Sequence, residues 1–483
     1  MPDFVESPCD YPGCSNGAVL AWAVCYMCGE IRCLEHDTVE MHDCNDIKDY
    51  EIRRVRAEKT NRRHLDSIVA RLRQCQDTIL KDCRSLRPGH ACTLSIPEHG
   101  DEITRSKLLG SFNVNFPITF DDGVRWMLRV RKDEDHRAPF EVRDPDIRIE
   151  VATLNWVKAN DVSVPAAWLP SHILGGSAEK PEMPLDYFYT ELIGGSPWTI
   201  NKHPSSAIDL PEDELRRFIE AFAQTQVQLS NLEVPVDKIG CLYPPSPNGA
   251  GGVVAGPMST NSCLRSPKPP YLLGPFSTLQ ERYLAQINAA LEFGLLGAFT
   301  RRYRVASHLW HLELRELVEN CAILAEKPDK LYIRHDDAKG DHMMRNDKHQ
   351  VVGIIDWQWA YATTKGEAFA APAIFYTDLA YIFRGDNSLR RDEKILIEMY
   401  DREGRADLAD CVRNGRLYHR LSRIGQYDAA YDKAAFREVL GPLPDGFDPP
   451  KDDQGWKAYM LDRYKDDEGL KKVIEKFGMD DGW

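Results

Sequence analysis

The sequence predicts an α+β protein in which a cysteine- and histidine-rich module and a long helix precede a mixed body. Three observations indicate this class: Cys and His cluster in the first 44 residues, two strand-like runs flank an Asp-Gly turn at 122–123, and apolar residues recur at helical spacing through much of the second half. The 483 residues are enough for two or three domains. A hydrophobic content of 43% and a charged content of 28% make a packed core feasible.

The first 45 residues contain a dense set of metal-binding side chains. Six of the 13 cysteines lie there, interleaved with two histidines. Eight soft ligands suffice for two closed tetrahedral Zn²⁺ sites, which are structural because no position is left open for a substrate. Metal binding would stabilise a segment too short to bury a core. The alternative, a disulfide-bonded knot, leaves the histidines unexplained and fits a reducing compartment less well.

The spacing of these ligands resembles the AN-one-type zinc finger, including its Cys-Leu-Glu-His…His-Asp-Cys ending. The resemblance implies that ligands alternate between the two sites. One zinc would be held by Cys9, Cys14, Cys33 and His36, and the other by Cys25, Cys28, His42 and Cys44. Because such fingers bind proteins, the resemblance also implies a protein partner at this module.

A helix and linker are expected over residues 46–100. The stretch 46–86 contains no Gly or Pro, and its apolar residues recur at three- and four-residue steps, which is typical of an amphipathic helix. These residues are Leu65, Ile68, Val69, Leu72, Ile79, Leu80, Cys83 and Leu86. We expect the helix to pack on the rest of the chain, and a coiled coil with a second copy is the alternative. Pro88-Gly89 end it, and a loop to about residue 104 marks a boundary.

A β-hairpin is expected next. The runs 107–120 and 124–131 flank the turn Asp121-Asp-Gly123. Alternation along the second run puts Arg125, Met127, Arg129 and Arg131 on one side. A helix is expected to begin at Glu150.

The stretch 332–357 carries the strongest chemical pattern in the chain. Val351-Val-Gly-Ile-Ile is a short, β-branched run that predicts a buried strand, and Asp356 follows at its end. Asp337 lies nineteen positions earlier, between His335 and His342. Phosphoryl transfer needs one carboxylate that orients the attacking hydroxyl and another that holds Mg²⁺ against the phosphates. The pattern therefore favours a phosphotransferase.

The same residues resemble the catalytic loop H-x-D-x-x-x-x-N and metal-binding strand of protein kinases. The segments His-Asp-Asp-x-Lys-Gly-Asp-His and Gly-Ile-Ile-Asp-Trp are similar to the aminoglycoside phosphotransferase-like (choline-kinase-like) family, in particular its fungal branch. The resemblance covers roughly residues 103–381. It implies a bilobal protein-kinase-like fold, with a small β-rich N-lobe over 101–200 and a C-lobe over 201–483 that ends in a helical subdomain.

The resemblance also implies roles for individual residues. Asp337 would be the catalytic base, and Asp356 the principal Mg²⁺ ligand. His342, which stands where most kinases carry Asn, would be the second metal contact, although imidazole suits a hard cation poorly. The residues implied to bind ATP are Gly110, Arg129, Glu150 and, through its backbone, Glu191. Arg131 competes with Arg129 for the phosphate-binding role.

Two functions remain open from the sequence. The first is an ATP- and Mg²⁺-dependent phosphotransferase acting on a hydroxyl of an unidentified, small-molecule acceptor. The second is a catalytically weak pseudokinase scaffold recruited through its zinc finger, which the sparse glycine loop and His342 favour. The net charge of −14 argues against a nucleic-acid-binding protein. The sequence shows neither an apolar run long enough to span a membrane nor a secretory signal, so we expect a cytoplasmic or nuclear protein.

Overall fold

The structure is a computed structural model that describes residues 7–8, 13, 17–18 and 47–479, with internal gaps. The gaps are 106–108, 111, 133–139, 175–184, 199–209, 246–251, 261–268, 298, 300–302, 378–380, 382–384 and 426–432. The side chains of 47–60 and of residue 140 are also outside the described set. In the N-terminal segment, β1 (Ser7–Pro8) pairs antiparallel with β2 (Gly17–Ala18). The predicted zinc ligands all lie outside the described residues: Cys9, Cys14, Cys25, Cys28, Cys33, His36, His42 and Cys44.

A five-stranded antiparallel sheet forms the strand-rich part of the body, in the order β3-β4-β5-β7-β6. Its strands are β3 (Cys92–Leu94), β4 (Asn113–Phe120), β5 (Arg125–Arg131), β6 (Ala167–Trp168) and β7 (Tyr187–Glu191). The predicted hairpin is confirmed, because β4 and β5 pair from Asn113↔Arg131 to Thr119↔Arg125. Gly123 adopts a φ of +84° in the turn, a conformation that glycine reaches without the steric cost of a Cβ.

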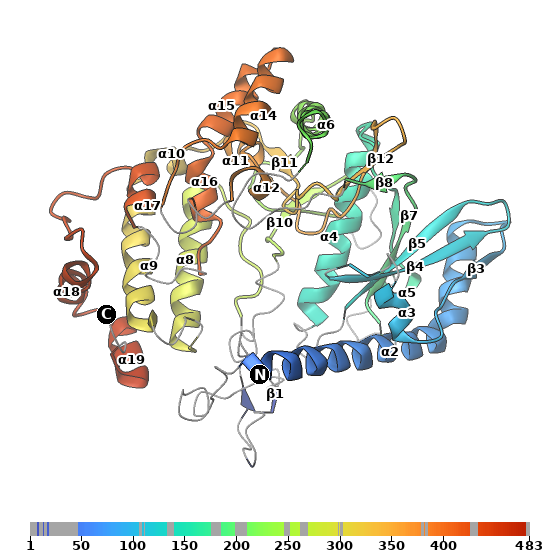
Figure 1. The fold of residues 1–483 in the computed structure, drawn as a ribbon, viewed down its shortest axis with the longest axis horizontal. Helices are drawn as coiled ribbons and strands as arrows, with labels where there is room; N and C mark the ends of the chain where they lie inside the picture. The colour runs from blue at the N-terminus through green and yellow to red at the C-terminus, as the bar shows by residue number, and fades with distance from the viewer. Residues whose placement is uncertain are drawn as a thin grey trace.

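Helix α2 (Ile47–Leu86) lies along one face of this sheet (Figure 1). Its apolar stripe is buried against apolar side chains of β4, β5 and β7 in one cluster. The buried helix residues are Leu65, Ile68, Val69, Leu72, Cys75, Ile79 and Cys83. Packing within the chain is therefore confirmed for residues 61–86 of the helix, and this stripe is not available for a coiled coil.

Helix α4 (Phe140–Ala159) corrects one expectation. The predicted start at Glu150 is wrong, because the helix begins ten residues earlier and contains Pro145. Burial of Ile147 and Ile149 in the core supports helix through this stretch, so tertiary packing outweighs the unfavourable propensity of proline. As a consequence, Asp146 lies one turn before Glu150 and on the same face of the helix.

A second, smaller sheet carries the chemically patterned stretch. Strand β12 (Met343–Arg345) pairs with β13 (Val351–Ile354) on one side and with β8 (Ser196–Pro197) on the other. The predicted strand at 351–355 is thus confirmed, with Ile354 as its last residue. Two further pairs lie nearby: β11 (Tyr332–Arg334) with β14 (Tyr361–Thr363), and β9 (Cys241–Tyr243) with β10 (Val254–Gly256). Residues 346–350 connect β12 to β13, and the segment 335–342 directly precedes β12.

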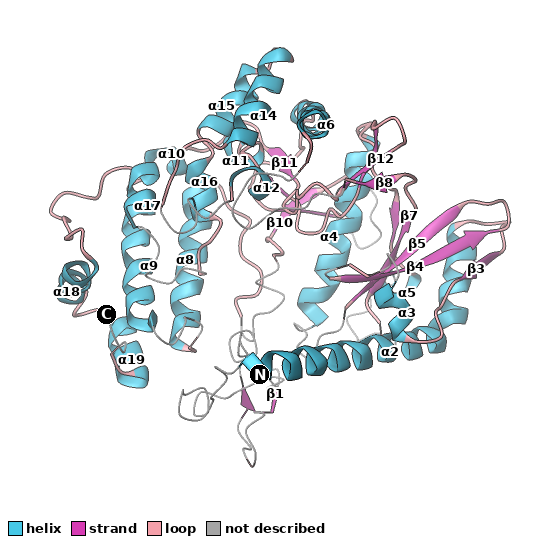
Figure 2. Ribbon diagram, viewed as in Figure 1, coloured by secondary structure: helices cyan, strands magenta, loops and turns pink. Residues whose placement is uncertain are grey.

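Helices dominate the remainder of the chain, and several of them lie at the opposite end of the molecule from the five-stranded sheet (Figure 2). The longer ones are α6 (Glu212–Ser230), α8 (Leu279–Leu295), α9 (Arg304–Glu319), α14 (Arg391–Arg402), α15 (Ala406–Arg413), α17 (Lys433–Leu440), α18 (Asp453–Arg463) and α19 (Glu468–Phe477). Helix α9 stops at Glu319, and the short helix α10 (Ala322–Ala325) follows it separately. Among the described residues, no helix is both long enough and apolar enough to cross a membrane.

Candidate functional site

The turn after β13 places Asp356 at the end of the strand. The Ile355 amide donates to the carbonyl of His342 at 2.8 Å, and the buried Trp357 indole donates to the carbonyl of Ile354 at 3.2 Å. Asp356 has a φ of +66° and Trp359 a φ of +64°. This left-handed region costs residues with a side chain about 1 kcal/mol each, so the surrounding bonds must hold the turn in place.

Arg129 contacts two of the predicted site residues, Glu150 and Asp356. Its Nη2 lies 2.7 Å from Asp356 Oδ1 and 3.4 Å from Glu150 Oε1. Burial by itself would raise the pKa of Asp356, but the charge and hydrogen bond of Arg129 outweigh it and lower the pKa from 3.8 to about 2. Asp356 is therefore fully ionised at neutral pH, and one cation links α4 to the strand end.

Arg131 has different partners, although it lies on the same side of β5. Its Nη2 is 2.8 Å from Glu150 Oε2 and 2.9 Å from Asp146 Oδ2, and its Nη1 donates to Asn113 Oδ1 at 2.8 Å. Both guanidinium groups lie over the Phe188 ring, 5.4 Å from it for Arg131. Of the two arginines that the sequence left in competition, Arg129 is the one that bridges Glu150 and Asp356.

Asp337 faces Lys339, whose Nζ donates to Asp337 Oδ2. The same ammonium lies 3.9 Å from Asp341 Oδ1. Burial would lower the pKa of Lys339, but its bond to Asp337 and the charges of Asp337, Asp341 and Asp356 raise it. Conversely, the charge of Lys339 contributes to the lowered pKa of Asp356. The two predicted carboxylates, Asp337 and Asp356, therefore act on the same ammonium group.

His342 is buried and uses its Nδ1 within the chain. The Gly340 amide donates to this nitrogen at 3.1 Å, so Nδ1 carries a lone pair and the neutral ring is protonated at Nε2. Burial and the neighbouring His335, 4.6 Å away between ring centroids, lower the pKa of His342 well below 6.5. Coordination of a metal through Nδ1 would require that the bond from Gly340 break.

Gly110 and Glu191 also have partners within the chain. The Gly110 amide donates to the carbonyl of Asn113 at 2.9 Å. Glu191 binds Lys158 at 2.6 Å and the Ala166 amide at 2.8 Å through its carboxylate, while its own amide donates to the carbonyl of Ala166. Its backbone donor is therefore already satisfied in the sheet, and a nucleotide base could meet only its carbonyl or the residues that follow.

Residues 110–409 match the phosphotransferase enzyme family known as APH. The chain belongs to this family. A search of curated proteins finds no match.

Solved structures that this phosphotransferase is similar to include aminoglycoside phosphotransferase APH(4)-Ia, at 14% identity over 76% of this chain and 98% of the other, with a TM-score of 0.39. A macrolide 2'-phosphotransferase type I is 16% identical over 76% and 97% of the two chains, with a TM-score of 0.37. A fructosamine-3-kinase, described as putative, from Thermobifida fusca is 15% identical over 69% and 90%, with a TM-score of 0.38.

Asp146 is a residue of this phosphotransferase that sequence reasoning missed. It is buried on α4 and contacts Arg131 and Gln358, which follows Asp356 by two positions. Its four-residue separation from Glu150 is the signal that could have found it, because such a spacing puts two carboxylates on one helix face. The signal was lost because the helix was expected to start at Glu150.

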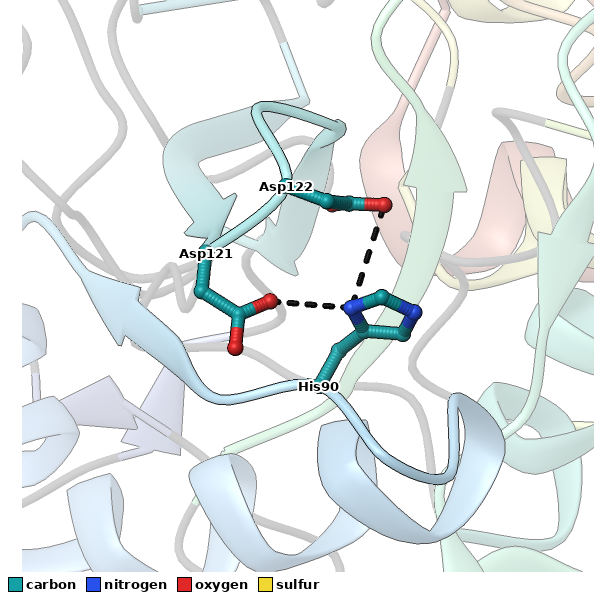
Figure 3. A group of neighbouring side chains, drawn as sticks. All are labelled: His90, Asp121 and Asp122. Carbon is teal, nitrogen blue, oxygen red and sulfur yellow. Dashed lines mark hydrogen bonds and ion pairs between the residues drawn. The ribbon is translucent and has the colours of Figure 1, made fainter.

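A second group of polar side chains lies at the β4–β5 turn (Figure 3). His90 Nδ1 is 2.9 Å from Asp121 Oδ1 and 3.8 Å from Asp122 Oδ2, and these atoms are close enough together to ligate one metal ion. However, Arg87 donates to both carboxylate oxygens of Asp122 and, with that bond as the largest cause, lowers its pKa strongly. The Arg87 guanidinium already neutralises the Asp122 carboxylate. This ion pair joins the β4–β5 turn to the residue that follows α2.

Proposed function

We propose that this phosphotransferase transfers the γ-phosphate of ATP, in the presence of Mg²⁺, to a hydroxyl of a small molecule on a bilobal protein-kinase-like fold. The observation that carries the proposal is the bridge from Glu150 through Arg129 to Asp356, beside the pair formed by Asp337 and Lys339. Phosphoryl transfer depends mainly on positioning and on stabilising phosphate charge. In this proposal Arg129 supplies a cation for phosphate, Asp356 an ionised carboxylate for metal and Asp337 a carboxylate for the acceptor.

Each side chain then has a distinct task. Asp337, whose side chain is 30% exposed, would accept the proton of the acceptor hydroxyl. Arg129 would donate to phosphate oxygens while Glu150 keeps its guanidinium in place. Gly110 lies in the segment before β4, where a side chain is absent and backbone can approach phosphate. Near the end of β7, the backbone around Glu191 would meet adenine.

Mg²⁺ fits the donor set at Asp356 better than at His342. Asp356 offers hard carboxylate oxygens that are ionised at neutral pH, whereas the Nδ1 of His342 accepts a bond from Gly340. When bound, the ion would neutralise charge on the transferring phosphate. Our proposal therefore makes Asp356 the principal ligand, with His342 as a second contact that requires its present bond to break.

The test is ATP-dependent phosphorylation across a panel of small hydroxyl compounds, with Asp337→Ala as the variant. We expect the variant to lose transfer while it keeps the melting temperature of the wild type to within a few degrees. Its side chain is partly exposed and, among the described residues, bonds to Lys339, so we expect the fold not to depend on it. Equal turnover by wild type and variant would refute the assigned base.

The bond from Gly340 to His342 favours a second candidate, a pseudokinase scaffold with weak or no catalysis. Thermal melting with ATP and Mg²⁺ separates the two, because a ligand that binds the native state raises the melting temperature by mass action. A rise supports the phosphotransferase. No rise at millimolar nucleotide supports the scaffold.

For the N-terminal residues, we propose an AN-one-type zinc finger over 1–45 that holds two structural Zn²⁺ ions and binds a protein partner. The helix and linker would occupy 46–100, the N-lobe 101–200 and the C-lobe 201–483, and the catalytic segments would place the chain in the fungal branch of the family. The zinc content of purified protein should be two ions per chain, and Cys25→Ser should lower it, because three remaining ligands hold zinc weakly. A metal-free wild type that is folded would contradict this module.

A further inference from the structure

Asp146 is buried and accepts hydrogen bonds from three segments that lie far apart in the sequence. Its Oδ2 is 2.9 Å from Arg131 Nη2 on β5 and 3.3 Å from Gln358 Nε2, in the turn that follows Asp356. Its Oδ1 accepts from the hydroxyl of Ser259, which is fully buried, at 2.8 Å. A buried carboxylate with several donors is strongly held, because charge-assisted bonds are about twice as strong as neutral ones.

These contacts close into a ring. Arg131 Nη1 donates to Asn113 Oδ1 at 2.8 Å, and Asn113 Nδ2 donates to Gln358 Oε1 at 3.5 Å. We name Asn113, Arg131, Asp146 and Gln358 the Asp146 ring. Asn113, Asp146 and Gln358 are each at most 5% exposed. The ring therefore links β4, β5 and α4 to the turn after β13 in a region that water barely reaches.

The Asp146 ring includes a residue of the turn 356–359, the part of the candidate site that has left-handed backbone. Gln358 lies between Asp356 and Trp359, the two residues of this turn that have left-handed backbone. The Trp359 ring packs edge-on against Phe112, next to Asn113, at 4.7 Å between centroids. The turn is thus held from both sides, by the segment before β4 and by the carboxylate on α4.

We propose that Asp146 is a positioning residue that couples α4 to the Asp356 turn, and this inference rests on the proposed function. Arg131 divides its charge between Asp146 and Glu150. Without the negative charge at 146, Arg131 would compete more strongly for Glu150, which Arg129 also needs. Gln358 would donate to a neutral oxygen in place of a carboxylate, which is a weaker bond, so one of the contacts that hold the turn presenting Asp356 would be weakened.

The experiment titrates full-length protein with mant-ATP in excess Mg²⁺ and measures each variant's melting temperature in parallel. Asp146→Asn keeps the shape of the side chain and removes its charge. We expect its dissociation constant to rise about tenfold, which corresponds to about 1.4 kcal/mol. The matched control is Asp144→Asn on the same helix, whose carboxylate pairs with Arg148 at 2.7 Å and does not contact the ring. We expect the control to bind within twofold of the wild type.

A second variant, Gln358→Met, opens the ring while leaving all its charges in place, and it also serves if Asp146→Asn fails to fold. We expect weaker binding from Gln358→Met, and a double variant no weaker than Asp146→Asn alone, because both changes break the same ring. A lower melting temperature with unchanged affinity in both single variants would mean that the ring is merely structural, and the inference would be overturned. If the wild type itself fails to bind mant-ATP, the proposed function fails and the inference falls with it.

Discussion

Removal of the carboxylate at 356 should change thermal stability in a way that depends on pH. The pKa of Asp356 is lowered from 3.8 to about 2, chiefly because Arg129 outweighs the effect of burial. A shift of this size corresponds to about 2 kcal/mol if fully realised. Because 35% of the side chain is exposed, solvent screening reduces the expected contribution to about 1 kcal/mol. We therefore expect Asp356→Asn to lower the melting temperature by about 1 °C at pH 7, because a chain of 483 residues has a large entropy of unfolding.

The sign of the pH dependence follows from the direction of the shift. A carboxylate whose pKa is lower in the folded state stabilises the fold fully at pH values above 3.8, where it is ionised in both states. This stabilisation is lost as the pH falls through the folded pKa of about 2. The difference in melting temperature between wild type and Asp356→Asn should therefore be constant from pH 7 to 5 and should narrow below pH 4.

The assay is thermal melting of both proteins in matched buffers between pH 7 and 3. Asp341→Asn is the control, because burial raises the pKa of Asp341, so its charge does not stabilise the fold. We expect this control to melt no lower than the wild type at pH 7. A gap for Asp356→Asn that stays the same at pH 3, or that is absent at pH 7, would refute the assignment of this ion pair.

Two other substitutions test the proposed nucleotide site and the packing of α2. Arg129→Gln removes charge-assisted bonds worth about 1.5–3 kcal/mol, so mant-ATP should bind about 10- to 150-fold more weakly, and wild-type affinity would show that this cation does not contact phosphate. Ile79→Ala, on the buried face of α2, should cost about 2–5 kcal/mol and lower the melting temperature, while the exposed control Lys81→Ala should not. An unchanged melting temperature for Ile79→Ala would show that α2 is not part of the fold.

Local patterns in the sequence were sufficient for most of the elements that carry the site. The period of β5 placed Arg129 and Arg131 on one side, and both contact the same Phe188 ring. The apolar stripe of α2 is buried where its spacing predicted. The strand before Asp356 ends at Ile354, one residue earlier than expected. These features are readable because they depend on neighbours within a few positions along the chain.

The start of α4 could not be read in the same way. Its first half contains Pro145 and many charges, and only burial of Ile147 and Ile149 against distant residues makes it helical. Because the helix was expected to begin at Glu150, Asp146 was not recognised as its neighbour on the same helix face. The occupied Nδ1 of His342 was also hidden, because the identity of a histidine's partner depends on where a backbone amide lies in space.

The sequence alone determined membership of the phosphotransferase family, because the segments that carry the likeness are runs of residue types along the chain, and it left the roles of Asp337, Asp356 and Arg129 as predictions. The tertiary structure decided which arginine reaches Asp356 and which turns to Asp146. Both side chains leave the same face of β5 two residues apart, so no local rule separates them. The choice is made by where α4 and the turn after β13 lie against that face, and those positions are set by contacts among residues more than two hundred positions apart.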